Sequence, residues 1–224
     1  MFLMDRFGYA RCIDIATYER NKEAADNENK YIFSCKNTGK ICLFTNTGQL
    51  HTVKVMDIPF GKFRDKGVPI DNISNFNGEK EIVIAAASQT SLNLYRLIFV
   101  TKQAMMKVVD GGEFDVAKRT VAATKLADDD EVVSVAVLNE QKQIVLQSKD
   151  GYFLKFGVEE IPEKKKNAIG VRGMKLTGTD HIENVYYLCS GVENTVEYRD
   201  KSLELHKLKA AKRDGKEIGR ASCR

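Results

Sequence analysis

A repeated unit constrains the fold of this chain more than any other feature of its sequence. Three copies begin with Thr or Ser at the end of a predicted strand and enter a tight turn, at residues 45–48, 101–104 and 148–151. Twelve residues after each hydroxyl, an acid precedes an apolar residue, in Asp57-Ile58, Glu113-Phe114 and Glu160-Ile161. Weaker copies, at 6–11 with Asp14-Ile15 and at 199–206, bring the number of units to about five.

Short runs rich in β-branched and aromatic residues fill the units, separated by Gly, Asn and Asp. The predicted strands cover residues 31–35, 40–44, 81–84, 94–100, 131–135 and 143–147. No long stretch has helical periodicity. A single small sheet cannot bury its own face, so the repeat predicts an all-β, propeller-like fold of about five blades with four strands each. An ordinary β-barrel with hairpin turns is the alternative, which the equal spacing disfavours.

The tight turns carry their own prediction. Gly8, Gly48 and Gly151 stand where a hairpin turn requires a positive φ. Ala104 occupies the same place in its unit and predicts a different turn type.

Length and composition indicate one domain of an ordinary globular protein. The 224 residues are 43% hydrophobic and 29% charged. The longest apolar run, 82–87, is far shorter than the roughly 20 residues of a membrane span, and the start of the chain does not resemble a secretory signal. We therefore expect a cytoplasmic protein with a domain over 1–213. Residues 214–224 break the repeat and are expected to be a tail, either a natural terminus or an expression-derived segment.

Residues that could support catalysis or bind a metal are scattered. The five cysteines are far apart with no CxxC pair, which predicts free thiols that pack as small core residues. His51, His181 and His206 stand alone. The acidic run 128–131 directly precedes a strand, so a solvated turn is favoured over a metal site. We expect neither a catalytic residue nor a metal site.

Basic residues are distributed locally. The formal net charge is only +4, but residues 141–175 contain eight Lys and Arg against four Asp and Glu. A basic stretch follows each acid of the repeat, and the candidate contacts are Lys62, Arg64, Lys66, Lys118, Arg119, Lys164, Lys165, Lys166, Arg172 and Lys175. Cations supplied once per blade predict a basic rim that binds the phosphate backbone of duplex DNA without reading its sequence. The alternatives are solvated lysines, a propeller that binds a protein partner, and an enzyme with a central funnel.

Several of these motifs resemble those of a known family. Residues 7–11, 101–107 and 148–156 are similar to its T-x-x-G-y-x-K blade signature. Residues 160–162 and 170–176, followed by Asp180, are similar to its e-i-P and G-V-x-x-m-k-L…g-D motifs. The resemblance covers 5–213 and is to the C-terminal domain of the A subunit of bacterial type IIA topoisomerases, DNA gyrase and topoisomerase IV.

This resemblance implies a β-pinwheel, a propeller-like domain whose blades exchange strands. It also implies a domain, monomeric when isolated, that binds and bends duplex DNA and presents the transported segment to the cleavage core. The partners would be the B subunit together with the rest of the A subunit. Catalysis, ATP and Mg²⁺ would belong to those regions, with no cofactor in this domain.

One departure from the family pattern concerns the gyrase box, Q-R-R-G-G-K-G. Gly8-Tyr9 and Tyr18-Glu19 match its frame, but residues 20–26 contain no glycine and two acids. Both changes disfavour close approach to phosphates. Arg20 and Lys22 remain candidate DNA contacts, and the degenerate box predicts a protein that is topoisomerase IV-like.

Overall fold

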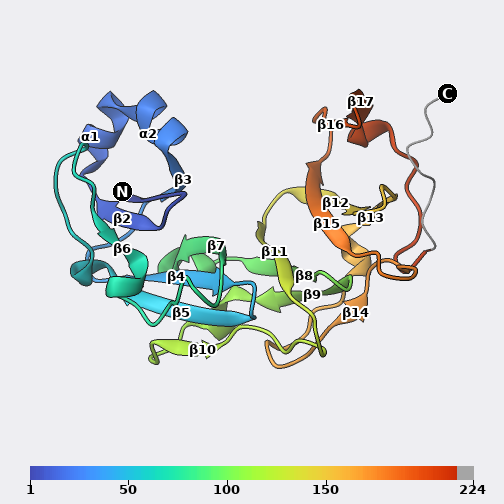
Figure 1. Ribbon diagram of the computed structural model, residues 1–224, viewed down its shortest axis with the longest axis horizontal. Coiled ribbons are helices and arrows are strands. Elements are labelled where there is room, and N and C mark those ends of the chain that lie inside the picture. Colours follow the sequence, from blue (N-terminus) through green and yellow to red (C-terminus); the bar gives the residue numbers. More distant parts are fainter. Residues whose placement is uncertain (216–224) are drawn as a thin grey trace. The chain divides into compact units, whose positions relative to one another are not determined.

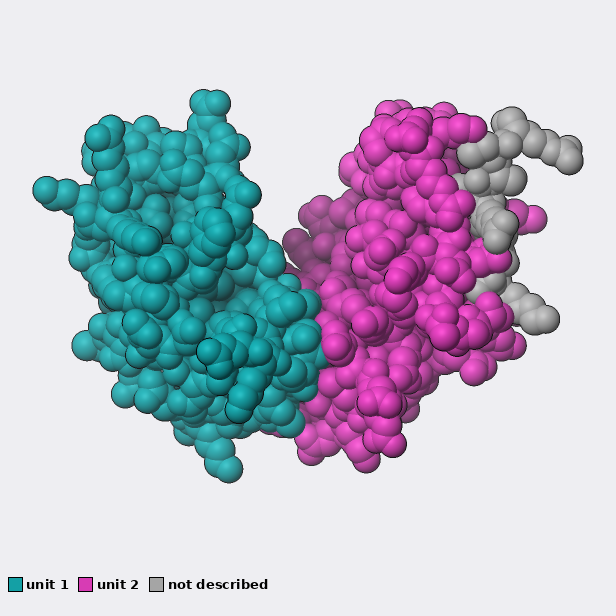
Figure 2. Space-filling view, viewed as in Figure 1, with its two compact units in different colours: residues 1–94, 111–123 teal, residues 95–110, 124–224 magenta. Residues whose placement is uncertain are grey.

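The computed structural model describes residues 1–215 and consists mainly of short strands in small antiparallel sheets (Figure 1). Five sheets are present among the described residues, three of four strands, one of three and one of two. The chain divides into two compact units, residues 1–94 with 111–123 (unit 1) and residues 95–110 with 124 onward (unit 2), coloured separately in Figure 2. No helix within 1–215 is long and apolar enough to cross a membrane. The prediction of an all-β fold with about five blades is confirmed, whereas only three of the five sheets among residues 1–215 have the predicted four strands.

Unit 1 contains two four-stranded sheets. The first has the strand order β3 (Asn29–Phe33), β1 (Phe2–Asp5), β2 (Tyr9–Cys12), β6 (Val68–Pro69). The second has the order β10 (Thr120–Ala122), β5 (Gln49–Lys54), β4 (Lys40–Thr45), β7 (Val83–Ser88). The helical elements are α1 (Ile15–Arg20), α2 (Lys22–Glu28), α3 (Gln89–Leu92) and the 3₁₀ turns η1 (Val55–Asp57), η2 (Ile70–Asn72) and η3 (Gly111–Phe114).

Unit 2 contains the other three sheets. The first has the strand order β11 (Val132–Leu138), β8 (Arg96–Thr101), β9 (Met105–Asp110), β14 (Val171–Arg172). The second has the order β13 (Phe153–Gly157), β12 (Gln141–Ser148), β15 (Ile182–Cys189). The third is formed by β16 (Thr195–Tyr198) and β17 (Lys201–Glu204). Two 3₁₀ turns, η4 (Val158–Glu160) and η5 (Leu205–Lys207), follow β13 and β17. The core of unit 2 is formed by inward-facing side chains of β8, β9, β12 and β13, with Met174 and Ile182.

Each four-stranded sheet receives its last strand late in the chain. β6 pairs with β2 only after the chain has formed the β4–β5 hairpin of the next sheet, and β14 pairs with β9 only after the β12–β13 hairpin. β10 reaches β5 in the same way after β8 and β9. This exchange of strands between successive sheets is the pattern expected of a β-pinwheel.

The hairpin turns explain the residue types of the repeat. In the first four of these turns, the side-chain oxygen of the first residue accepts a hydrogen bond from the amide four residues later: the Tyr9 amide donates to Asp5 and the Met105 amide to Thr101, both at 3.0 Å. The same bonds join Gln49 to Thr45 and Tyr152 to Ser148, both at 3.3 Å. A short polar side chain at this position therefore closes the turn.

Gly8, Gly48 and Gly151 have positive φ angles of 84°, 76° and 90°, as predicted. The prediction of a different turn at Ala104 is wrong. Ala104 has a φ of 64°, and its amide bonds to the Thr101 carbonyl at 2.9 Å, as Gly48 bonds to Thr45. The alanine thus adopts the left-handed conformation, at a cost of about 1–2 kcal/mol, and its methyl group is fully buried in the core of unit 2.

The acid-apolar pairs of the three full repeats are structurally equivalent. Asp57, Glu113 and Glu160 lie in η1, η3 and η4, and the apolar residue after each is buried. The weak copy at Asp14-Ile15 is not equivalent. Asp14 caps α1 by accepting a 2.8 Å hydrogen bond from the Thr17 amide, and Ile15 is 61% exposed. The sequence pattern did not predict the two short helices that follow.

Candidate functional site

The three predicted basic stretches lie on the segments 59–67, 115–119 and 162–170, and a fourth segment, 208–213, has the same place after a 3₁₀ turn; the four are here called the basic connectors. Each follows a 3₁₀ turn and runs beside the second strand of a hairpin formed earlier in the chain. The backbone amides of Cys12 and Val108 donate to the carbonyl oxygens of Pro59, at 2.8 Å, and Pro162, at 3.1 Å. The amide of Thr52 donates to the Arg119 carbonyl and the amide of Ala211 to the Lys155 carbonyl, both at 2.8 Å. The recurrence predicted from sequence therefore corresponds to one recurring structural position.

Most of the predicted cations on the connectors are exposed. Lys62, Arg64, Lys66, Lys118, Arg119, Lys164 and Lys165 have exposed side chains, and Lys166 is half-buried. Within the described residues, Lys62, Arg64, Lys118 and Lys164 form no ion pair. Each unit therefore presents cations from two connectors to solvent, in a form able to neutralise phosphates.

Two of the exposed cations have partners that fix their direction. The Lys66 ammonium lies 4.4 Å from the ring centroid of Tyr9. The Arg119 guanidinium donates a 3.1 Å hydrogen bond to the Ile73 carbonyl. The first contact holds the connector 59–67 close to the sheets of unit 1, and the second does the same for the connector 115–119, while both side chains stay exposed.

A buried lysine holds the connector 162–170 in place. The Lys107 side chain is fully buried, and its ammonium donates to the carbonyl oxygens of Lys165 at 3.2 Å, Lys166 at 2.8 Å and Ala168 at 2.6 Å. Since a buried ammonium requires such partners, the connector backbone is bound to β9 while the side chains of Lys164 and Lys165 reach solvent. Sequence reasoning missed this role. The available signal was a lysine between apolar residues of a strand.

Lys155 attaches η5, the 3₁₀ turn that precedes the connector 208–213. It is buried in β13 and donates to the carbonyl oxygens of His206 at 2.8 Å and Leu205 at 3.4 Å. Burial lowers the pKa of Lys155, because desolvation disfavours the charged form.

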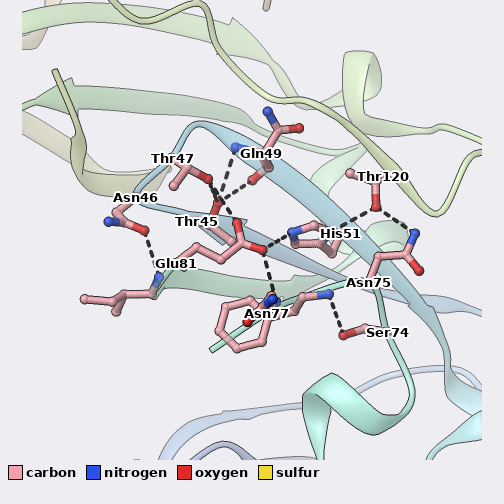
Figure 3. A network of polar contacts seen from close by, with 12 residues as sticks. Thr45, Asn46, Thr47, Gln49, His51, Ser74, Asn75, Asn77, Glu81 and Thr120 are labelled. Atoms are coloured by element: carbon pink, nitrogen blue, oxygen red, sulfur yellow. Dashed lines mark hydrogen bonds and ion pairs between the residues drawn. The ribbon is translucent and has the colours of Figure 1, made fainter. Parts of the chain in front are cut away.

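In unit 1 a histidine joins β10, the strand that follows the connector 115–119, to a polar network (Figure 3). His51 lies in β5, with Nδ1 2.9 Å from Thr120 Oγ1 and Nε2 2.7 Å from Glu81 Oε1. Burial acts to raise the pKa of Glu81, but hydrogen bonds from Thr45, the Asn77 amide and Thr47, with the charge of His51, together lower it. The network ties β10 to the segment that precedes β7.

Arg172 and Lys175 lie just beyond the connector 162–170. Both are exposed, but the Arg172 guanidinium forms a two-pronged ion pair with Asp214, with Nη2 3.2 Å from Oδ2. The hydrogen bond from Arg172 lowers the pKa of Asp214. The predicted tail therefore begins with a residue bonded to unit 2, and its remainder from 216 lies outside the described residues.

Two glycines at the ends of connectors are required by the packing of the fold. Gly170 has a φ of 105°, and a Cβ atom there would lie 2.3 Å from the Met106 carbonyl oxygen. Gly67, at the end of the connector 59–67, has a φ of 77° and is equally close to the Ala10 carbonyl oxygen. At both glycines the absence of a side chain lets the connector approach the neighbouring strand of the same chain.

Arg20 and Lys22 lie apart from the connectors. Arg20 ends α1 and donates to Thr17 Oγ1 at 3.2 Å, and Lys22 begins α2. Both are exposed or partly exposed, and Glu23 and Asp26 of α2 are exposed beside them. The position of the gyrase box is therefore occupied by a short helical pair.

The acidic run 128–131 forms a turn. Asp130 is buried and accepts hydrogen bonds from the amides of Gln103 at 2.9 Å and Glu131 at 2.8 Å, whereas Asp128 and Asp129 are exposed. Among residues 1–215, no group of three His, Cys, Asp or Glu side chains is placed to hold a metal ion. The run closes the turn before β11.

Comparisons with known proteins identify relatives of this chain. A family model described as "DNA gyrase C-terminal domain, beta-propeller" matches residues 95–139 and 142–187. The A subunit of DNA gyrase from Helicobacter pylori is 29% identical over 187 residues, covering 78% of this chain and 23% of that protein. The A subunit of DNA topoisomerase 4 from Bacillus subtilis is 28% identical over 152 residues, covering 67% of this chain and 19% of that protein.

A solved structure has the same fold. The crystal structure of the C-terminal domain of DNA topoisomerase IV aligns with a TM-score of 0.83 and 23% identity, covering 97% of this chain and 71% of that one. The chain thus spans about a quarter or less of the length of the curated relatives, whereas most of this solved domain is matched.

Proposed function

We propose that this chain, which belongs to the family of C-terminal domains of the A subunits of DNA gyrase and topoisomerase IV, binds duplex DNA through its phosphate backbone and bends it. The observation that carries the proposal is the equivalence of the basic connectors. Four segments supply cations, three of them through parallel bridges to the second strand of a hairpin and 115–119 through a bond from Thr52 to its last residue; the exposed cations include Lys62, Lys118 and Lys164. Contacts of this kind neutralise phosphates without reading bases.

Within a longer protein, the domain would present the transported DNA segment to a cleavage core. We assign the ATP-dependent chemistry, with its ATP and Mg²⁺, to the B subunit and to the rest of the A subunit. The chain itself would contribute binding and geometry. The competing function is a propeller that binds a protein partner without DNA, because propeller-like folds serve many unrelated functions.

Titration of the 224-residue chain with unrelated duplexes at several salt concentrations separates these functions. DNA binding through about six phosphates predicts that log K falls with log[salt] with a slope of about −5, similar for every sequence. Absent binding, or binding that does not change with salt, would favour the protein-interaction module. Circular permutation of a bound duplex in gel shift then measures the bend.

Within the family, we propose that the chain is topoisomerase IV-like. Support comes from residues 20–26, where α1 and α2 replace a glycine-rich box and expose Glu23 and Asp26. Exchanging these residues for a glycine-rich basic box should increase DNA wrapping, measured as added writhe in a topology assay. If the exchanged protein keeps its thermal unfolding midpoint and adds no writhe, the degenerate box does not limit wrapping.

A further inference from the structure

Two cysteines that are far apart in sequence meet in the first sheet of unit 1. Cys12 is paired with Phe2 across β1 and β2, and Phe33 is paired with Phe2 across β1 and β3. Phe33, Phe2 and Cys12 therefore share one face of the sheet, and Cys35 lies two residues beyond Phe33, just past the end of β3. Cys35 packs against the core cluster that contains Cys12.

Both thiols line one pocket of about 500 Å³ with an apolar wall. Cys12 is 4% exposed and Cys35 is half-buried, so a reagent in the pocket reaches Cys35 first. Val55 and Ile58 form part of the wall, and the exposed side chains of Met56 and Phe60 lie at its edge. The geometry therefore separates an accessible thiol from a protected one.

The two thiols also differ in acidity. A hydrogen bond between them stabilises the thiolate of Cys35 and lowers the pKa of Cys35 to about 7, while the same bond raises the pKa of Cys12. A thiolate is the form that attacks disulfides, and an attacking thiol whose pKa is near the ambient pH reacts fastest. Cys35 is thus the nucleophile of the pair and Cys12 the second thiol.

We propose that Cys12 and Cys35 are a redox-active pair that is converted to an intramolecular disulfide by small disulfides of the glutathione class. In the first step the Cys35 thiolate attacks one sulfur of the small disulfide and releases one thiolate, leaving a mixed disulfide on Cys35. In the second, Cys12 loses its proton and attacks the Cys35 sulfur, releasing the second small thiolate. The protein loses two hydrogens, and the small disulfide is reduced to two thiols.

The crosslink would close a loop of residues 13–34, which carries α1 and α2 with Arg20 and Lys22. Closing this loop restricts the unfolded chain, so oxidation should raise the thermal unfolding midpoint of unit 1, and a reductant should reverse the change. This proposal does not depend on DNA binding.

The test uses the full chain with Cys189 and Cys223 replaced by Ser, which leaves Cys12, Cys35 and Cys42. After incubation with oxidised glutathione at mildly alkaline pH, intact mass spectrometry should show a chain lighter by two hydrogens, with no retained glutathione. After alkylation of the remaining thiols, the same chain should carry one alkylated site. In that background, Cys12→Ser should hold one glutathione on Cys35. Cys35→Ser should show neither crosslink nor adduct at Cys12.

Cys42→Ser is the matched control, because Cys42 is buried in β4 and burial raises its pKa to about 12. It should leave the crosslinking rate unchanged. A stable glutathione adduct on Cys35 while Cys12 is present would overturn the proposal, as would a crosslinking rate that falls when Cys42 is replaced. An unfolding midpoint that stays the same after complete crosslinking would remove the inferred restraint on the loop.

Discussion

The ammonium of Lys107 donates a 2.6 Å hydrogen bond to the carbonyl oxygen of Ala168, 61 residues later in the chain. The contact joins the interior of a strand to a solvent-facing connector. Two further bonds, to the carbonyl oxygens of Lys165 and Lys166, make the connection a three-point attachment. The cations of the connector are therefore presented by a backbone whose path is fixed from inside the fold.

Replacing Lys107 with Met should release this connector. Removing the ammonium leaves three partly buried carbonyl groups without their donor, so we expect a loss of stability of about 1–3 kcal/mol and faster hydrogen exchange at the amides of 164–168. Affinity for duplex DNA should fall although Lys107 does not reach solvent. Lys155→Met is the control, since it removes another buried lysine, in β13, whose ammonium bonds to η5 and not to 164–168. If both variants expose 164–168 equally, Lys107 has no specific role there.

Replacing Lys164, Lys165 and Lys166 together with Ala should weaken binding to all duplexes alike. The slope of log K against log[salt] should become shallower by about 1 to 3, because each lost phosphate contact removes about 0.9. A matched triple variant removes Lys142, Lys149 and Lys201, which are exposed in unit 2 but lie off the connectors. Equal slopes for the two triple variants would remove this connector from the interface.

Asp214→Asn should strengthen DNA binding. Asp214 engages Arg172 and is also close to Lys175 and Arg213, so its charge opposes phosphate binding at that surface. Its loss frees the Arg172 guanidinium, and we expect a severalfold higher affinity at low salt and a slope steeper by about 1. Asp200→Asn removes the same charge from the β16–β17 turn. An equal gain in both variants would indicate a net-charge effect without a role for Arg172.

Much of the architecture could be predicted because the repeat reflects local constraints. The hydroxyl of Thr101 and the buried side chain of Phe114 are each required within one copy of the sequence repeat, so the spacing between them is visible in the sequence. Ala104 was predicted wrongly because a turn can force an alanine to a positive φ when the surrounding hydrogen bonds require it.

The candidate site was predictable only in part. The connectors were found because their cations follow a fixed spacing. The attachment through Lys107 and the pairing of Arg172 with Asp214 were missed, since both join residues more than 40 positions apart. Such contacts depend on strand exchange, which the local sequence does not encode. The meeting of Cys12 with Cys35 was missed because it depends on how β2 and β3 pair with β1.

Gly170→Ala should be more damaging than Gly178→Ala, although both glycines have positive φ in unit 2. At Gly178 no atom lies within 4 Å of an added Cβ, so only the backbone cost of about 1–2 kcal/mol applies. At Gly170 the Cβ would meet the Met106 carbonyl oxygen, which moves only if the connector separates from β9. Urea unfolding should show a larger loss for Gly170→Ala, together with weaker DNA binding. Equal losses would mean that the connector tolerates displacement.

The Glu81 carboxylate should make unit 1 sensitive to acid. Its pKa in the folded protein is below the usual 4.5, so its contribution to stability is fully present above about pH 4.5 and is lost as the pH falls through the folded-state value. Glu81→Gln removes the charge beside His51 and should destabilise unit 1 at neutral pH. The difference in free energy of unfolding between this variant and the unchanged protein should shrink as the pH falls below the usual pKa of 4.5. Urea unfolding from neutral to strongly acidic pH measures it.

Glu79→Gln is the control for this titration, because Glu79 is exposed two residues away. Its unfolding midpoint should follow that of the unchanged protein across the whole range. If Glu81→Gln remains less stable than the unchanged protein at the acidic end, the carboxylate acts by its shape and hydrogen bonds alone. In that case the charge of Glu81 would contribute nothing to holding β10 against β5 through His51.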